Sequence, residues 1–332
     1  MTNRIGTSGR RDFLQMMGMG LAGLALSNRG LAEPQARPLR GLFPIAFTPI
    51  TPGDKVDLDG MAAQVKFCNR GGVHGLMWPQ NASGWTMLSD AERMEGNEVT
   101  LSAGKGGKTA IVIGVQSADP EAVSRYAKQA EKLGADAIIS LPPTGVTDEK
   151  GVLAYYQQVG RLTSLPLFAQ AVGNVSVDLL VEMFKTIPTM RYVKDEAGVP
   201  VDRVAELRQK TGDQLKVFSG AGGATMITEL ERGFSGSCPY TTLADVFATV
   251  FDLWHKGKKQ EAFDMFGRIQ AFGSITPVSS IDIMIARGVF KPGTKTRLPQ
   301  TGGGGRTRGS RQLSIEEIRT ELDAYLKPYL KA

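Results

Sequence analysis

The chain contains little histidine and little cysteine. Its 332 residues include two of each: His74 and His255, Cys68 and Cys238. A histidine-rich metal centre needs a cluster of such ligands. His74 begins an expected strand and His255 ends an expected helix, and neither position is typical of a ligand. The sequence therefore predicts no metal site and no cofactor.

The two cysteines are expected to stay unpaired. Cys68 falls near the end of the first expected helix, and Cys238 falls near the end of the last expected strand. In a βα barrel these ends lie on opposite faces, too far apart for a disulfide. We therefore expect two free thiols, packed as small buried apolar side chains.

A concentrated basic surface is also missing. The net charge is +6, but half of it lies in residues 1–32, where four arginines face one aspartate. No basic stripe with interleaved aromatic residues appears, so nucleic acid is not an expected partner. Hydrophobic residues make up 42% and charged residues 22% of the chain, as is typical of soluble globular proteins.

Residues 1–32 are expected to be a twin-arginine signal peptide. Arg10 and Arg11 precede a weakly apolar run to Leu26, and Gly30-Leu31-Ala32 suits a cleavage site. The run is shorter than the roughly 20 residues that span a bilayer. We therefore predict a folded periplasmic protein without membrane contact after signal removal. An uncleaved N-terminal helix or a disordered basic arm are the alternatives.

From Gly41 onwards, apolar β-type runs alternate with segments of helical periodicity. Near-continuous apolar strands that are each followed by a helix indicate a parallel sheet covered on both faces. Eight such units predict an α/β fold, a (β/α)₈ TIM barrel. The eight expected strands are Leu42–Pro49, Gly75–Pro79, Thr109–Gln116, Ala135–Pro142, Pro166–Val172, Arg191–Asp195, Leu215–Ser219 and Phe234–Pro239.

The expected division follows from this pattern. Residues 33–240 hold the barrel strands and helices, and residues 241–332 hold the last barrel helix and a C-terminal helical extension. The glycine- and arginine-rich segment Thr301–Ser310 is expected to be a mobile surface loop, because no strand precedes it. Helices are expected in the C-terminal part at Thr242–His255, Lys259–Gly273, Ile281–Val289 and Ser314–Leu330.

One lysine stands out at the end of the sixth expected strand. Strand alternation puts Tyr192, Lys194 and Glu196 on one face. If this face lines a barrel, the amine lies in a partly dry pocket, which disfavours an ammonium ion and makes a lysine nucleophilic towards carbonyl carbon. The alternative is a strand-end lysine whose side chain extends to water.

Short fragments around this lysine follow one another at barrel spacing. They are Phe47-Thr48-Pro49, Ser83-Gly84, Leu88-Ser89-Asp90-Ala91-Glu92-Arg93, Gly114-Val115, Leu141-Pro142-Pro143, Val193-Lys194, Ser219-Gly220 and Arg297-Leu298-Pro299. In this order the sequence resembles the dihydrodipicolinate synthase / N-acetylneuraminate lyase family of Schiff-base aldolases and lyases. The resemblance covers nearly the full mature length.

The resemblance implies a class I carbon–carbon lyase or aldolase that acts on an α-keto acid or its aldol adduct. Lys194 would form an imine, typically with pyruvate, and the protonated imine is an electron sink for the neighbouring carbon–carbon bond. Related proteins are commonly homotetramers, so a homo-oligomer is expected. The expected partner is a small α-keto acid or aldehyde.

The loop after the second strand forms a carboxylate cradle in that family. Here the hydroxyl of Ser83 and the backbone N–H groups of Ala82 and Ser83 are the expected ligands. The alternative for Ser83 is a hydroxyl that is satisfied within its own turn. Gln170, Gly220 and Cys238, at other strand ends, complete the expected substrate-binding set.

The sequence departs from the family where protons are usually moved. The tyrosine that ends the fifth strand in the family falls on Ala169 or Gln170 here, and neither can act as a general acid. Four replacements are open: Glu196, Asp195, Tyr240 or a water held by Gln170. Dihydrodipicolinate synthesis itself is therefore not expected.

Further departures lie around the expected pocket. Asn174 matches an arginine that often binds a second carboxylate in the family, and Trp85 replaces a glutamate. Trp78 and Trp85 flank the cradle loop and either stack on a bound ring or pack between barrel and helices.

Two other functions of the protein stay open. One is a keto-sugar-acid dehydratase or hydratase that uses the same imine, and the other is a non-catalytic periplasmic binding protein on a degenerate barrel.

Overall fold

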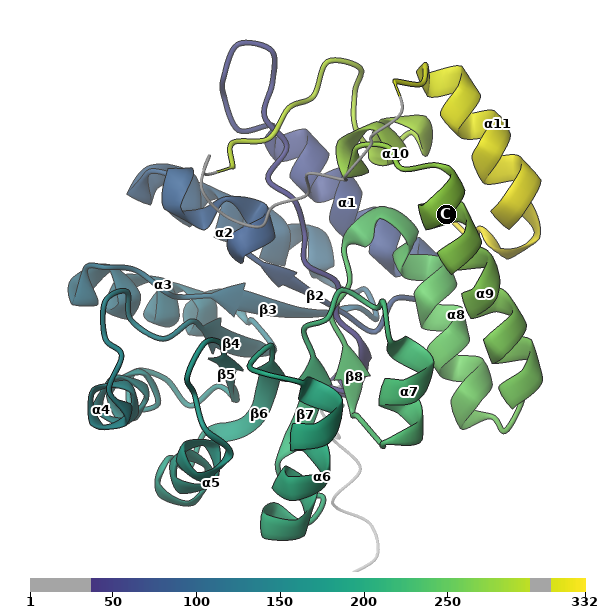
Figure 1. Cartoon of the computed structure of the whole chain (residues 1–332). Helices are drawn as coiled ribbons and strands as arrows, with labels where there is room; N and C mark the ends of the chain where they lie inside the picture. The colour runs from purple at the N-terminus through teal and green to yellow at the C-terminus, as the bar shows by residue number, and fades with distance from the viewer. Residues whose placement is uncertain (1–36, 299–311) are drawn as a thin grey trace, which may run out of the picture. The chain divides into compact units, whose positions relative to one another are not determined.

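Eight short parallel strands form one sheet in the computed structural model, which describes residues 37–298 and 312–332 (Figure 1). The expected signal peptide and the expected loop Thr301–Ser310 lie outside the described residues. The strands are β1 (Gly41–Leu42), β2 (Gly75–Trp78), β3 (Ala110–Gly114), β4 (Ala137–Ser140), β5 (Leu167–Ala171), β6 (Met190–Asp195), β7 (Lys216–Ser219) and β8 (Gly236–Ser237).

The sheet closes on itself. Its order runs β1-β8-β7-β6-β5-β4-β3-β2, so β1 and β2 are the two ends. Between these ends, the N–H of Met77 donates to the carbonyl oxygen of Pro44, and the N–H of Ala46 donates to that of Met77, each at 3.0 Å. The predicted (β/α)₈ TIM barrel is therefore confirmed.

The first strand is shorter than predicted. Regular pairing covers Gly41–Leu42, and the expected Leu42–Pro49 continues only through isolated bridges at Ile45 and Ile50. Pro44 and Pro49 have no backbone N–H, so each removes a donor from the ladder. The chain still runs between its two neighbours and completes the barrel wall.

Helices cover the outside of the barrel and begin at polar caps. Ser89 accepts a hydrogen bond from the N–H of Glu92, whose side chain accepts one back from Ser89. Gly134 ends its helix in the left-handed region, at φ 82°. The helices are α1 (Leu58–Gly71), α2 (Asp90–Gly104), α3 (Pro120–Leu133), α4 (Glu149–Val159), α5 (Val177–Thr186), α6 (Pro200–Thr211), α7 (Met226–Glu231) and α8 (Ala244–His255).

Three further helices form a C-terminal extension: α9 (Lys259–Ile275), α10 (Ser280–Ala286) and α11 (Ile315–Leu326). Figure 1 shows α9 beside α8, with α10 and α11 near it. A buried bidentate ion pair between Arg287 and Asp245, at 2.7 Å, joins the extension to α8. In the part of the chain that the structure describes, no single helix could cross a membrane, and α9 with α10 qualify only as a pair bent by 113°.

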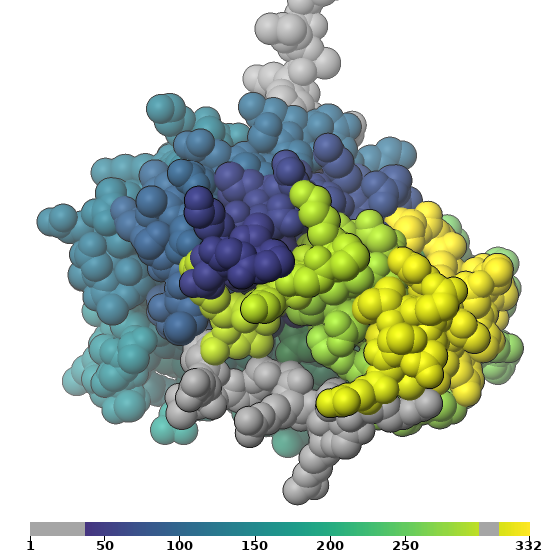
Figure 2. All heavy atoms as spheres, turned by 90° about the horizontal axis from the view of Figure 1, so that it is seen from above, coloured from purple at the N-terminus to yellow at the C-terminus, as the bar shows by residue number. Residues whose placement is uncertain are grey.

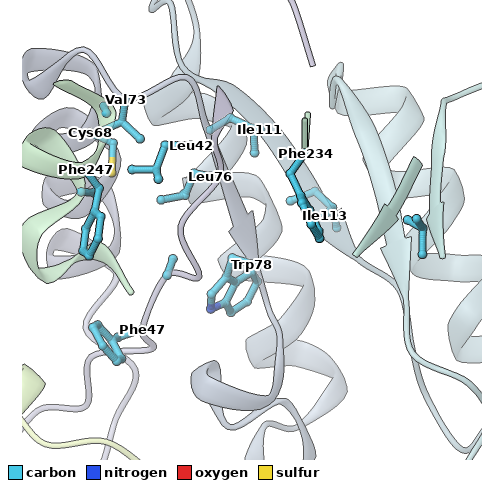
Figure 3. Close-up of a cluster of buried hydrophobic side chains, with 14 of the residues drawn as sticks. Leu42, Phe47, Cys68, Val73, Leu76, Trp78, Ile111, Ile113, Phe234 and Phe247 are labelled. Carbon is cyan, nitrogen blue, oxygen red and sulfur yellow. The ribbon is translucent and has the colours of Figure 1, made fainter. Parts of the chain in front are cut away.

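Two layers of apolar side chains make the core. Phe43, Phe168 and Phe218 fill the inside of the barrel, where their ring centroids lie 5.1–6.2 Å apart. A larger layer lies between strands and helices and includes Trp78 (Figure 3). We call the three inner phenylalanine rings the aromatic floor. The space above it, at the carboxyl ends of the strands, is left for polar groups.

A segment from the C-terminal part crosses this end of the barrel. The backbones of Ile50 and Lys295 exchange two hydrogen bonds at 2.8 Å, and Figure 2 shows the yellow-green residues before 299 against the purple first segment. A Cβ at Gly84 would lie 1.9 Å from the carbonyl oxygen of Arg297. The segment therefore packs directly on the loop after β2.

Candidate functional site

Lys194 points into the barrel, as strand alternation predicts. Its side chain is 5% exposed. On either side, Lys194 pairs in register with Gln170 on β5 and with Phe218 on β7. One layer below, Tyr192 stacks on Phe168 with ring centroids 4.4 Å apart. The amine therefore lies above an aromatic floor and does not extend to bulk water.

Glu196 is the direct partner of this amine. One carboxylate oxygen forms an ion pair with Nζ of Lys194. The other accepts a hydrogen bond from Nε2 of Gln170 at 3.1 Å, and Gln170 is 1% exposed. A carboxylate that is oriented by a buried amide and touches the amine is placed to exchange protons with it.

Gly220 makes room for this arrangement. A Cβ at Gly220 would lie 2.0 Å from Cγ of Glu196, which is far inside van der Waals contact. The N–H of Gly220 donates to the carbonyl oxygen of Asp195 at 2.9 Å and fixes the loop after β7. The missing side chain thus allows Glu196 to reach Lys194.

One of the four predicted replacement acids, Asp195, is held away from the amine. Asp195 is fully buried on the opposite face of β6, where both its oxygens accept from Nε of Arg203 at 2.9 and 3.2 Å. Burial raises the pKa of Asp195, while Arg203 opposes the rise. The Asp195 alternative is therefore wrong. Tyr240 packs with its ring 5.6 Å from that of Phe47, and its hydroxyl has no hydrogen bond within the described residues.

The loop after β2 holds Ser83 differently from the expected cradle. The Ser83 hydroxyl donates to the carbonyl oxygen of Ala46 at 2.5 Å and accepts from the N–H of Gln80 at 3.0 Å. The N–H of Ser83 donates to the carbonyl oxygen of Gln80 at 2.9 Å. The hydroxyl is thus bound partly within its own turn, by Gln80, and partly by the first segment, through Ala46, and the substrate-binding role of Ser83 stays a prediction. Of the expected cradle donors, only the N–H of Ala82 lacks a partner among the described residues.

Two buried glutamines belong to this end of the barrel and were not among the predicted site residues. The side-chain amides of Gln80 and Gln116 both donate to the carbonyl oxygen of Pro79 at 2.9 Å. The Oε1 atoms of Gln80, Gln116 and Gln170 have no partner among the described residues. Gln80 and Gln116 each lie two residues past the end of an apolar strand, which was the available signal in the sequence. Each of these buried oxygens keeps unused capacity to accept a hydrogen bond.

Arg93, on α2, holds the end of β3 from the outer side of the barrel. Its guanidinium donates to the carbonyl oxygens of Gly114 and Gln116 at 2.8 and 3.0 Å, and it lies 4.2 Å from the Tyr126 ring centroid. Burial lowers the pKa of Arg93 to about 10. The resulting position of the Gln116 backbone sets where its side-chain amide enters the barrel.

Cys238 contributes a small apolar wall. It is 3% exposed within the inner core layer, and burial raises the pKa of its thiol to about 12. Both cysteines are free and buried, as predicted. Such a thiol stays protonated at neutral pH and is a poor nucleophile.

The two tryptophans have different environments. Trp78 is fully buried in the outer core layer, and its Nε1 donates to Oγ1 of Thr48 at 2.9 Å (Figure 3). The stacking alternative is therefore wrong for Trp78. Trp85 is half-buried, and its Nε1 donates to Oδ1 of Asn81 at 3.0 Å.

The histidines do not approach the amine. His74 precedes β2 at the amino end of the barrel, with Nε2 3.0 Å from Oδ1 of Asp252. Across residues 37–298 and 312–332, no group of three or more His, Cys, Asp or Glu side chains could hold a metal ion.

A pocket of about 270 Å³ opens between the loops after β4 and β5. We call it the β4–β5 pocket. Apolar side chains form most of its wall, and Asn174 and Glu149 are polar members of the lining. The main apolar members are Pro142, Pro143, Val146, Val152, Val172 and Leu179.

Comparison of the sequence with known protein families agrees with this architecture. The sequence model of the Dihydrodipicolinate synthetase family covers residues 38–286. The chain belongs to this family. A 4-hydroxy-tetrahydrodipicolinate synthase from Rhizobium meliloti is 29% identical over 188 residues, which are 54% of this chain and 63% of that protein. The chain thus matches somewhat less than two thirds of the length of such curated relatives.

Solved structures of low sequence identity share the fold. A catalytic lysine mutant of the Ruminococcus gnavus sialic acid aldolase has a TM-score of 0.74 at 16% identity, covering 89% of this chain and 100% of that one. A prophage protein from Escherichia coli K12, solved in complex with pyruvate, has a TM-score of 0.73 at 15% identity. It covers 86% of this chain and 98% of that one.

Proposed function

We propose that this protein is a Schiff-base lyase or aldolase that acts on an α-keto acid or its aldol adduct. One observation carries the proposal: the buried amine of Lys194 touches the carboxylate of Glu196 above the barrel floor. Membership of the dihydrodipicolinate synthetase family supports it. So does the shared fold of the Ruminococcus gnavus sialic acid aldolase, one solved form of which is a catalytic lysine mutant.

In the proposed reaction, Glu196 performs the proton transfers. It takes a proton from the Lys194 ammonium, and the free amine then attacks the keto carbon to form a C–N bond. Glu196 returns that proton to the former keto oxygen, then takes a second proton from the nitrogen and passes it to the resulting hydroxyl, which leaves as water and gives the protonated imine. Glu196 next accepts the proton of the substrate's 4-hydroxyl while the neighbouring C–C bond breaks, and the electron pair moves towards the imine nitrogen.

Glu196 replaces the family's tyrosine shuttle in this proposal. Gln170 stands where that tyrosine is expected, but its amide binds the carboxylate and orients it. We infer that Gln170 is a positioning residue and that the proton carrier has moved one strand along. A changed proton carrier also supports a substrate other than that of dihydrodipicolinate synthesis.

The proposal is tested by product analysis with a panel of 4-hydroxy-2-keto acids and keto sugar acids. We expect pyruvate and an aldehyde from the first class, detected by NMR. Loss of water without carbon–carbon cleavage would favour the dehydratase alternative. Ligand binding without turnover in wild type and in Lys194→Ala would favour the binding-protein alternative and contradict the proposal.

Gly220→Ala is expected to reduce kcat about 100-fold, because small displacements of a catalytic group have effects of that order. The new Cβ would collide with Glu196 and push its carboxylate away from Lys194. The control is Gly267→Ala on α9, where a Cβ meets nothing within 4 Å. Full activity in Gly220→Ala, with an unchanged melting temperature, would show that the position of Glu196 does not matter.

We also propose that the protein is exported to the periplasm, as the paired arginines in residues 1–32 indicate. The double variant Arg10→Lys, Arg11→Lys is expected to stay in the cytoplasm at full length. The wild type and the matched variant Arg29→Lys are expected as a shorter periplasmic form. Fractionation and mass spectrometry measure both. A full-length cytoplasmic wild type would contradict export.

The proposed partners follow from the same membership. We infer a small α-keto acid or aldehyde as substrate and a homo-oligomer, a homotetramer by family resemblance. Light scattering of the purified protein measures the assembly. A mass equal to one chain would contradict the oligomer.

A further inference from the structure

The β4–β5 pocket opens at the same end of the barrel as the Lys194 amine. Val172 follows Gln170 by two residues, just past the end of β5, so at most about 7 Å of chain separates the two. The pairing between β5 and β6 continues to the end of β5, since the N–H of Glu196 donates to the carbonyl oxygen of Ala171 at 2.8 Å. Gln170 pairs in register with Lys194, so a molecule bound to the amine can extend over Gln170 towards this pocket.

The lining of the pocket favours an uncharged group. Prolines, valines and a leucine supply most of the wall, and the single charged lining residue is Glu149. No lysine, arginine or histidine belongs to this lining. A carboxylate placed here would lose water without gaining a cation, and it would face a like charge.

Asn174 occupies the position where a second carboxylate would be bound by resemblance to the family. It is an exposed member of the pocket lining, and a neutral amide cannot form the bidentate ion pair of an arginine with a carboxylate. The volume of about 270 Å³ exceeds the roughly 150 Å³ in which a buried apolar cavity binds benzene. The space thus suits an aromatic ring or a short alkyl chain.

We propose that the β4–β5 pocket binds the uncharged apolar tail of the substrate. The substrate class is then a 4-hydroxy-2-keto acid whose far end is an alkyl or aromatic group. In the condensing direction, Glu196 takes a proton from the methyl carbon of the pyruvate imine, and the resulting enamine carbon forms a bond to the carbonyl carbon of an apolar aldehyde. The aldehyde oxygen takes a proton from Glu196 and becomes the hydroxyl. This inference rests on the proposed imine chemistry of Lys194.

The test is condensation of pyruvate with aldehydes of increasing length, measured as kcat/KM by the full chain. We expect kcat/KM to rise about fourfold for each added methylene until the pocket is full. This factor corresponds to the free energy gained when one methylene is buried. Benzaldehyde is expected among the best acceptors. Aldehydes of equal length that carry a carboxylate or several hydroxyls are expected to react at least tenfold more slowly. Equal or faster reaction of these polar acceptors would overturn the inference.

Two variants at one exposed position make the test specific. Asn174→Arg is expected to raise kcat/KM about tenfold for a carboxylated aldehyde, because hydrogen bonds to charged groups contribute this much. Asn174→Leu, which is matched in size but neutral, is expected to give no such gain. Equal effects of both variants on charged and apolar acceptors would show that the pocket does not hold the tail.

Imine formation and aldehyde preference are measured separately. Trapping of wild type with pyruvate and borohydride reports imine formation without any aldehyde. If no adduct forms, the proposed function itself is wrong. If the adduct forms but no apolar aldehyde condenses, or polar acceptors are preferred, only the pocket assignment is wrong.

Discussion

Lys194→Ala is expected to abolish turnover, with kcat reduced at least about 10³-fold, as when a covalent nucleophile is removed. Alanine leaves the barrel floor intact but removes the group that forms the bond to the keto carbon. Glu196 keeps its hydrogen bond from Gln170, so its carboxylate is not left without a partner. The loss should therefore appear in kcat rather than in the fold, which circular dichroism and the melting temperature report.

The matched control for this prediction is Lys216→Ala on the next strand. Lys216 lies at the start of β7 and pairs with Asp213 at 2.8 Å, and its side chain is 36% exposed. Its removal takes away a lysine of the same sheet without touching the site. We expect wild-type activity. If Lys194→Ala keeps more than a tenth of wild-type kcat, a covalent mechanism through this residue is contradicted.

Glu196→Gln is expected to lower kcat by about 10²- to 10⁴-fold, the usual contribution of a positioned general acid–base. The substitution is nearly isosteric, so the space made by Gly220 stays filled. The amide cannot take the proton from the amine or return it to the departing oxygen. Imine formation should slow, and quench-flow trapping with borohydride at increasing times measures that rate directly.

Glu206→Gln on α6 is the control for this second prediction. Glu206 pairs with Lys210 at 2.8 Å on the outer surface, and its neutralisation should leave kcat unchanged. If Glu196→Gln forms the trapped adduct as fast as wild type, Glu196 is not the proton carrier. The remaining predicted candidates, Tyr240 and a water on Gln170, would then be tested by Tyr240→Phe and Gln170→Leu.

The barrel could be predicted because its signals are local. Each inner strand is a short apolar run, such as Ala110–Gly114 with every residue buried. Each helix between such runs carries its own periodicity and cap. The first strand is shorter than predicted because its prolines remove hydrogen-bond donors. This effect depends on which neighbouring strands it meets. The β4–β5 pocket depends likewise on two loops from different βα units.

The catalytic pair could be predicted only in part. The alternation of Tyr192, Lys194 and Glu196 indicated the correct face, but the choice of Glu196 depends on Gly220 and Gln170 from two other strands. Asp195 is equally close in sequence, yet Arg203 holds it on the outside. Such selection requires contacts between distant segments, which no local pattern contains.

Ser83 illustrates the same limit at the cradle loop. A loop hydroxyl in the correct register suggested a ligand. Its direction, however, is set by the carbonyl oxygen of Ala46 on the first segment. The N–H of Ala82 remains the one expected cradle group with free hydrogen-bonding capacity among the described residues.

The central claim is that the buried amine of Lys194 attacks a keto carbon. Its most direct test is incubation with pyruvate and borohydride, followed by digestion and peptide mass spectrometry. We predict one modified peptide, containing Lys194, heavier by the mass of pyruvate less one oxygen atom. An unmodified Lys194 peptide, or an adduct spread over surface lysines such as Lys216 and Lys258, would contradict the account.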